Sequence, residues 1–368
     1  MAELPAESVT VSTRARRPCA TRRLVLLVAV VALVALAAAC SGGDGATSEG
    51  GRVRLIAPNG LRGLLDRERS TSQTTTTAPT TTTTTLPVAP FPVAQTSATF
   101  VDHARGGPAR GDAPAQASRT IRTTIWYPTS VPPSEANPHP PAAVGAYPLI
   151  VFAHGYAIDA ASYTPLLRDL AVGGYVVAAP DFPGTSTAYP GAADRQDSLE
   201  QPADISFVIT SVLDLAAQPG PLQGSIDPNA VGVSGQSDGG VTANAAGWNT
   251  CCRDPRVKAG VIYTGATFAF EGEWFSPGTP PIMFVHATAD EVNPYSASQS
   301  MFERAQSPKY LMTIDGGSHL EVYVDPPWEP HVAAASVAFF DLHLKGDQSA
   351  AVRLDTLATQ PGYSLQKG

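Results

Sequence analysis

The feature that most constrains the fold of this chain is an alternation of short apolar runs and amphipathic segments that starts near residue 148. Continuous apolar runs closed by glycine or proline suit strands that are buried on both faces of a sheet. Such strands are expected at 148–153, 175–179, 230–234, 257–263, 281–286 and 310–314. Helices are expected at 162–171, 203–215, 238–246, 296–305 and 331–344, the last of them closing the fold. This order predicts an α/β protein with a mainly parallel central sheet, helices on both faces and no large cap domain.

Two earlier strands are expected at 99–103 and 119–127, where Thr, Ile, Val and Trp are frequent. The loops around them are rich in proline and glycine, which suits an antiparallel start to the sheet. The sequence has no internal repeat and no interior linker, so residues 93–368 are expected to form one domain.

The first 40 residues are typical of an export signal. Five arginines between Arg14 and Arg23 precede a 16-residue stretch without charge, 24–39, which ends in three alanines before Cys40. A membrane-spanning helix needs about 20 apolar residues, so a cleaved signal suits this stretch better. It resembles a bacterial lipoprotein signal, in which the cysteine receives lipid, so Cys40 is the predicted lipidation site. The expected location is the outer face of the bacterial cell membrane, with secretion or an uncleaved membrane anchor as alternatives.

Residues 41–92 are expected to form a disordered tether. Glycine and serine are frequent in 41–51, and 71–87 holds eleven threonines and two prolines. Such a composition buries too little apolar surface to offset the entropy of folding, and tracts of this kind are often O-glycosylated.

Charge and motif content narrow the classes of partner. Residues 93–368 carry 14 basic and 26 acidic side chains, a net charge of about −12. A body this acidic repels a phosphate backbone, so nucleic acid is not an expected partner. The sequence holds no cluster with metal-ligand spacing, no phosphate-binding loop and no dinucleotide fingerprint. We therefore expect no metal and no cofactor. The expected oligomeric state is a monomer.

The strongest chemical signal is Gly235-Gln236-Ser237-Asp238-Gly239, which matches G-x-S-x-G between an expected strand and an expected helix. A sharp strand-to-helix turn of this kind exposes the serine hydroxyl at the sheet edge, and the flanking glycines prevent collisions of β-carbons. The amino end of the helix offers amide groups to a developing oxyanion. Ser237 is therefore the predicted nucleophile. The alternative is a tight glycine turn with a solvated serine.

A serine hydroxyl needs a base to become a nucleophile. Among the seven histidines, His319 follows the last expected strand in a loop from which it can reach across the sheet edge. His154 and His286 lie at the ends of buried strands and are expected to be structural. Asp290 follows the strand before and is the predicted acid that orients the base, with Glu291 as the fallback.

On these residues the chain resembles the α/β-hydrolase superfamily, whose catalytic groups follow the chain order serine, acid, histidine. The segments that carry the resemblance are 151–156, 174–181, 235–239, 286–290 and 316–319. Within the superfamily, the chain is most similar to secreted bacterial esterases of the platelet-activating-factor-acetylhydrolase-like and dienelactone-hydrolase-like groups. Polyester-degrading cutinase-like enzymes are close relatives of these groups. The resemblance implies that 93–368 is an α/β-hydrolase catalytic domain.

The resemblance also implies which backbone amides hold the oxyanion. In that family one donor is the residue after the His-Gly pair, here Tyr156, and the other is the residue after the nucleophile, here Asp238. Dienelactone hydrolases use a cysteine nucleophile, so Ser237 argues against their reaction. Cutinase-like enzymes commonly have methionine at the position of Asp238, which argues against a polyester substrate.

These features predict a serine carboxylic-ester hydrolase of the lipase or esterase type, which acts through an acyl-enzyme at the cell envelope. No amphipathic lid insertion is visible, which favours small or short-acyl esters as substrates, including lipid esters. The alternatives are an acyltransferase that acylates envelope sugars, a polyester-degrading cutinase-like hydrolase, and a non-catalytic envelope protein on this fold.

Two features stay open at this level. Several aromatic residues either line an acyl pocket or belong to the core. They are Tyr156, Phe182, Tyr263, Phe268, Phe270, Trp274 and Phe275, and the pocket candidates among them are Phe182, Tyr263, Trp274 and Phe275. Cys251 and Cys252 form either a vicinal disulfide or two reduced thiols in a packed turn.

Overall fold

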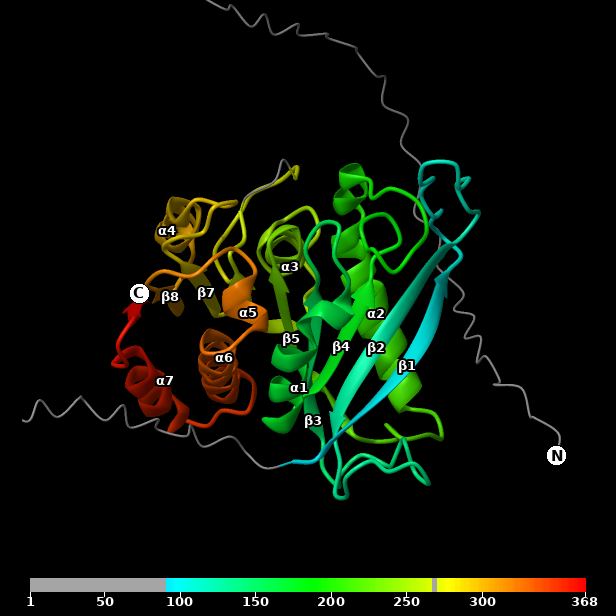
Figure 1. Ribbon diagram of the computed structural model, residues 1–368, viewed down its shortest axis with the longest axis horizontal. Coiled ribbons are helices and arrows are strands. Elements are labelled where there is room, and N and C mark those ends of the chain that lie inside the picture. Colours follow the sequence, from blue (N-terminus) through cyan, green and yellow to red (C-terminus); the bar gives the residue numbers. More distant parts are fainter. Residues whose placement is uncertain (1–90, 267–269) are drawn as a thin grey trace, which may run out of the picture. The chain divides into compact units, whose positions relative to one another are not determined.

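The computed structural model of the protein describes residues 91–266 and 270–368. The predicted export signal, Cys40 and all but the last two residues of the predicted tether lie outside the described residues. At the centre is a nine-stranded sheet in the order β1-β2-β4-β3-β5-β6-β7-β8-β9 (Figure 1). The strands are β1 (Val93–Asp102), β2 (Arg119–Pro128), β3 (Tyr147–Ala153), β4 (Val176–Asp181), β5 (Ile226–Gln236), β6 (Val257–Tyr263), β7 (Ile282–Ala287), β8 (Lys309–Ile314) and β9 (Tyr363–Lys367).

The strand directions follow the predicted pattern. The six neighbouring strands from β4 to β8 run parallel, whereas β1, β2 and β9 pair antiparallel with their neighbours. Parallel strands place their carboxyl ends at one edge of the sheet, where active sites of open α/β proteins are built. The architecture is that of an α/β-hydrolase fold, as the sequence predicted.

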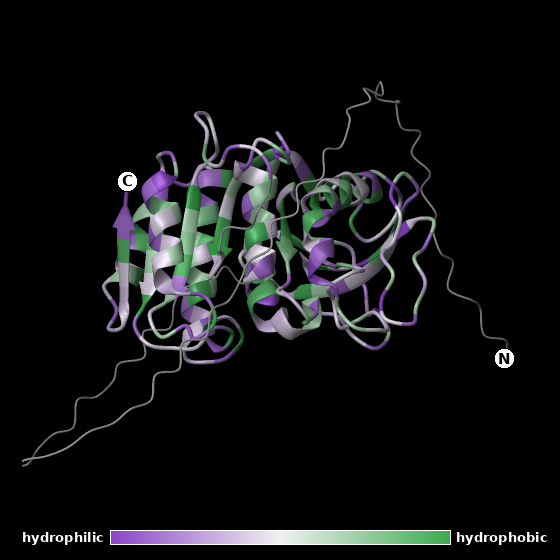
Figure 2. Cartoon of the chain, turned by 90° about the horizontal axis from the view of Figure 1, so that it is seen from above, coloured by the Kyte–Doolittle hydropathy of each residue, from purple (hydrophilic) through white to green (hydrophobic). Residues whose placement is uncertain are grey.

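Helices cover both faces of the sheet. They are η1 (Ala160–Tyr163), α1 (Thr164–Val172), η2 (Arg195–Leu199), α2 (Gln201–Ala216), α3 (Asp238–Trp248), α4 (Tyr295–Arg304), α5 (Glu321–Val324), α6 (Trp328–Leu344) and α7 (Ala350–Ala358). Helices α2, α3 and α4 share one hydrophobic cluster with the sheet, and α1, α5, α6 and α7 share the other. Along β3, Leu149 and Val151 face the first cluster and Ile150 and Phe152 the second, so the strand is apolar at every position. Figure 2 shows these hydrophobic strands in green between the helices.

Several predicted boundaries were wrong, among them the start of β1, which is Val93 rather than 99. Helix α6 does not close the fold, because α7 and β9 follow it and β9 adds an antiparallel strand to β8. Strand β5 starts at Ile226 rather than 230, since its ladder with β3 shifts register and so passes Pro228. The helix expected from 162 begins as the 3-10 turn η1, with α1 following from Thr164.

The carboxyl edge of the sheet is open in the described residues. The connection from β4 to α2 holds only η2, and no separate cap domain is built on this edge by residues 91–266 and 270–368. Within the same ranges, no helix combines the length and the apolar character needed to cross a lipid bilayer.

Candidate active site

Ser237 lies on a sharp turn between the end of β5 and the first residue of α3. Its backbone has φ 57° and ψ −124°, an unusual conformation for a residue other than glycine. A β-carbon at Gly235 would collide with the backbone of Gly239, and one at Gly239 would collide with the carbonyl oxygens of Ala153 and His154. The turn therefore requires both glycines of the G-x-S-x-G sequence. It leaves Ser237 buried except for about a twelfth of its surface, at 8% exposure.

The three side chains predicted to act together do meet at this edge. The Ser237 Oγ lies 2.8 Å from His319 Nε2. The other ring nitrogen of His319, Nδ1, lies 2.8 Å from Asp290 Oδ2 and 3.0 Å from Oδ1. Because Nδ1 faces a carboxylate, it carries the proton, and Nε2 is free to accept one from the hydroxyl of Ser237. The arrangement can activate a serine hydroxyl by the Ser-His-Asp chemistry.

The carboxylate of Asp290 contacts five groups, of which the ring of His319 is one. Its side chain is fully buried, and its Oδ1 accepts hydrogen bonds of 2.8 Å from the amides of Val292 and Asn293. Its Oδ2 accepts from the hydroxyl of Thr264 and lies 3.2 Å from His286 Nε2. Burial raises the pKa of Asp290, but the hydrogen bonds from His286, His319 and Thr264 outweigh it and hold the pKa well below the ordinary value. The carboxylate of Asp290 is therefore ionised at neutral pH.

His286 was expected to be structural, and it lies fully buried behind Asp290. Its Nδ1 is 2.7 Å from Ser298 Oγ and its Nε2 is 3.0 Å from the carbonyl oxygen of Asn293. Thr264 was not singled out in the sequence, since a threonine after a strand carries no signal of its own. The structure brings both residues into contact with the acid.

Glu291, the fallback acid, contacts the backbone of His319 rather than its ring. Its Oε2 accepts a hydrogen bond of 3.1 Å from the backbone amide of His319. Gln236, the second residue of the motif, holds the same loop from the other side, because its Nε2 donates to the carbonyl oxygen of His319 at 2.9 Å. Both contacts fix the backbone that carries the imidazole.

The two amides expected to hold an oxyanion have no competing acceptor. Among the described residues, neither the amide of Tyr156 nor that of Asp238 donates a hydrogen bond. Asp238 is the first residue of α3, and the first amides of a helix lack intrahelical partners. The positive end of the α3 dipole adds to the attraction for an anion there.

His154 fixes the backbone next to Tyr156. Its Nε2 accepts from the amide of Phe182 at 3.0 Å, so the proton sits on Nδ1, which donates to the carbonyl oxygen of Gly155 at 2.7 Å. Burial lowers the pKa of His154, which keeps the ring neutral. This is the structural role that its position at a strand end suggested.

The aromatic pocket candidates mostly belong to the core. Phe182 and Tyr263 are fully buried, and Phe275 is 2% exposed, so these side chains offer no surface to a substrate. Trp274 is half-buried and packs against the core, and Tyr156 is 36% exposed. Phe268 lies outside the described residues. The sequence left open whether these aromatic residues line a pocket or belong to the core. Phe182, Tyr263 and Phe275 belong to the core.

Cys251 and Cys252 follow α3 and are joined by a disulfide. The amide of Cys251 donates to the side chain of Asn249 at 2.9 Å. The same turn meets the segment after β6, because the amide of Thr250 donates to the carbonyl oxygen of Glu273 at 3.0 Å. The disulfide is thus part of a packed turn outside the Ser237 site.

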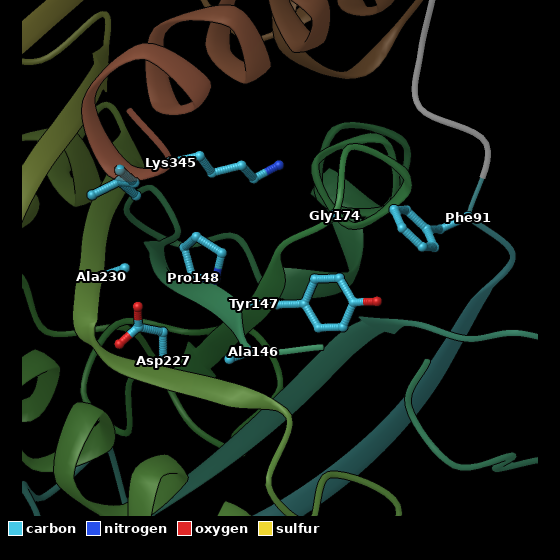
Figure 3. Close-up of a pocket in the computed structure, with 9 residues that line it drawn as sticks. Phe91, Ala146, Tyr147, Pro148, Gly174, Asp227, Ala230 and Lys345 are labelled. Carbon is cyan, nitrogen blue, oxygen red and sulfur yellow. The ribbon is translucent and has the colours of Figure 1, made fainter. Parts of the chain in front are cut away.

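A groove of about 430 Å³ lies at the opposite edge of the sheet (Figure 3). Tyr147 and Pro148 at the start of β3 line it, as does Lys345 after α6. Lys345 Nζ already donates to the carbonyl oxygen of Gly173 at 2.7 Å and pairs with Asp341 at 2.8 Å. The groove brings no nucleophile and base together. The carboxyl edge is therefore the better candidate for chemistry. No group of three or more potential metal ligands occurs in 91–266 and 270–368.

Comparison with known families agrees with the fold. A family model described as chlorophyllase matches residues 117–257, which run from the start of β2 to the start of β6. The match includes Tyr156, Ser237 and Asp238 but ends before Asp290 and His319. Together with the mostly parallel sheet, it indicates an ester hydrolase of the α/β-hydrolase type.

Proposed function

We propose that this α/β-hydrolase is a serine carboxylic-ester hydrolase that acts on small or short-acyl esters through an acyl-enzyme. The observation that carries the proposal is the chain of contacts from Ser237 Oγ through His319 to Asp290, at 2.8 Å for each step. The similarity to an esterase family over 117–257 supports the reaction class.

The proposed reaction follows from this geometry. His319 Nε2 takes the proton of Ser237 as its Oγ attacks the acyl carbonyl carbon. The amides of Tyr156 and Asp238 hold the oxyanion of the tetrahedral intermediate. His319 then protonates the departing alcohol, and a water molecule activated by the same ring releases the acid. Each oxyanion donor lowers the barrier by about 3–4 kcal/mol in enzymes of this kind.

Two exposed side chains in loops that carry groups of the site support a neutral acyl group as substrate. Tyr156 is 36% exposed and Val292 is 56% exposed, and both lie in loops that carry groups of the site. The envelope location and the lipid on Cys40 stay proposals that rest on the sequence alone. An acyltransferase on this site would need an acceptor alcohol in place of water and would show turnover that depends on that acceptor.

The nucleophile and base are tested by Ser237→Ala and His319→Ala. Each should lower the hydrolysis of p-nitrophenyl butyrate by roughly 10⁴-fold or more, since triad members act as a unit. A fluorophosphonate probe should label the wild type at Ser237 and neither variant. Ser318→Ala, next to the base in the chain, is the matched control and should keep both activity and labelling.

Two results would reject the proposal. One is a wild-type protein, folded by its circular dichroism, that the probe does not label at Ser237. The other is a near-normal rate in Ser237→Ala or His319→Ala.

A further inference from the structure

The carboxylate that follows the nucleophile is paired rather than free. Arg195 Nε donates to Asp238 Oδ2 at 2.7 Å and its Nη2 donates to Oδ1 at 2.8 Å, a bidentate geometry. The Asp238 side chain is 7% exposed and that of Arg195 is 53% exposed, so the arginine is the solvent-facing partner of the pair. The hydrogen bond with Asp238 raises the pKa of Arg195.

The same arginine also contacts Tyr156, the other residue whose amide is proposed to hold the oxyanion. Its guanidinium carbon lies 5.1 Å from the centroid of the Tyr156 ring, within the range of a cation–π contact. The hydroxyl of Tyr156 donates to the carbonyl oxygen of Ala193 at 2.9 Å. Segment 193–195 therefore binds the side chains of both Tyr156 and Asp238, which come from separate elements of the fold.

This segment is itself firmly anchored to the sheet. Arg195 begins η2, and Asp197 in the same turn forms hydrogen bonds of 2.7 and 2.6 Å with the buried Arg119 at the start of β2. The Asp197 Oδ2 also accepts from the amide of Gly184 at 3.1 Å. Because this turn is anchored, it can fix the positions of the Tyr156 and Asp238 side chains that it binds.

We propose that Arg195 is a positioning residue that holds the two amides of the oxyanion hole at their working distance and neutralises Asp238 beside the oxyanion. This inference rests on the proposed ester hydrolysis and adds a residue to it. No sequence motif indicates Arg195, because it lies 42 positions before Ser237 in the connection between β4 and α2.

Arg195 also acts through its positive charge. Asp238 is the residue next to Ser237 in the chain, so an unpaired carboxylate there would oppose the negative charge that develops beside Ser237. Such repulsion is strongest where the surrounding protein lowers the effective dielectric constant, and the Asp238 side chain is only 7% exposed. Arg195 neutralises the carboxylate of Asp238, while the backbone amide of Asp238 remains available to the oxyanion.

The first test is Arg195→Gln in the full chain, with p-nitrophenyl butyrate as substrate. We expect kcat to fall about tenfold or more while KM changes less than about threefold, because the loss falls on the transition state. The inhibition constant of a small alkylboronic acid, which forms a tetrahedral adduct with the serine, should rise in parallel with the loss of kcat/KM. Arg195→Lys, which keeps the charge without the fork, should lie between the variant and the wild type.

The second test is charge rescue. If the unpaired carboxylate causes part of the loss, Arg195→Gln combined with Asp238→Asn should be at least about threefold faster than Arg195→Gln alone. Arg122→Gln is the matched control, since Arg122 also lies over a tyrosine ring, Tyr189, at 4.1 Å but does not contact Asp238. It should keep the wild-type kcat.

The outcomes separate the two proposals. Arg195→Gln within twofold of the wild-type kcat, a change confined to KM, or a double variant no faster than Arg195→Gln would overturn the role of Arg195 and leave the esterase intact. A wild type that hydrolyses no ester and resists the fluorophosphonate would overturn both.

Discussion

At the scale of single residues, Thr264 has the most constrained position near the site. Its φ of 44° lies in the left-handed region, which costs a residue with a β-carbon about 1–2 kcal/mol. Its amide donates to Val285 at 2.9 Å, its carbonyl oxygen accepts from Asn293 at 2.7 Å, and its hydroxyl donates to Asp290. A strained backbone held by this many contacts next to a proposed catalytic acid suggests a functional cause for the strain.

Thr264→Val tests that cause, because valine keeps the shape and removes the hydroxyl. With one hydrogen bond fewer, the pKa of Asp290 should rise, and the more basic carboxylate should hold a proton on His319 more tightly. The acid limb of the kcat/KM profile should then move to higher pH, by up to roughly one unit. Thr264→Ser keeps the hydroxyl and is the control. A profile that Thr264→Val leaves in place would show that the hydroxyl has no part in setting the acid.

At the scale of elements, the turn from β5 to α3 was predictable because its sequence signature lies within five consecutive residues. Gly239 must lack a β-carbon, and the serine must stand one residue before a helix. The neighbouring aromatics were not predictable, since the same residue types fill cores and pockets alike. The pairing of β9 with β8 was also not predicted from the sequence. The five residues of β9, Tyr363–Lys367, show only a weak alternation of apolar and polar side chains and lie near the end of the chain.

Two glycines of α3 should differ in their tolerance of a β-carbon. Gly239→Ala should remove nearly all activity and lower stability by several kcal/mol, because its methyl group would meet the backbone of Ala153 and His154. Gly247→Ala places the same methyl 3.5 Å from Val257 and should be neutral or stabilising by up to about 1 kcal/mol. Thermal melts and p-nitrophenyl butyrate rates compare the two. An active, stable Gly239→Ala variant would contradict the close approach of the turn to β3.

At the scale of the whole molecule, the meeting of Ser237, Asp290 and His319 followed from topology. All three come after parallel strands, and parallel strands share a carboxyl edge, so the sequence order of strands was enough to bring them together. Arg195 and Thr264 could not be found in this way. Their roles depend on side-chain contacts made by connecting segments whose course no motif specifies, so only the folded chain places them.

Stability as a function of pH is a property of the whole fold, and Glu329 in α6 should govern part of it. The residue is 4% exposed, and its Oε1 has no hydrogen-bond partner in the described ranges. Burial, together with the charge of Asp169, raises the pKa of Glu329 from 4.5 to about 7. The native state therefore holds a proton on Glu329 that the unfolded chain releases, so the contribution of this residue to stability falls as pH rises from 4.5 to about 7.

Glu329→Gln mimics the protonated acid at every pH. Above pH 7 the variant should exceed the wild type in unfolding free energy by about 2–3 kcal/mol, and near pH 4 the two should be alike. Urea titrations at pH 4 and pH 8 measure both gaps. Asp290, whose pKa is depressed, acts only below its unfolded value of 3.8 and so leaves this window unaffected. Glu303→Gln removes an exposed carboxylate as a control and should change neither gap. An equal gap for Glu329→Gln at both pH values would mean that the carboxyl group is not protonated in the fold.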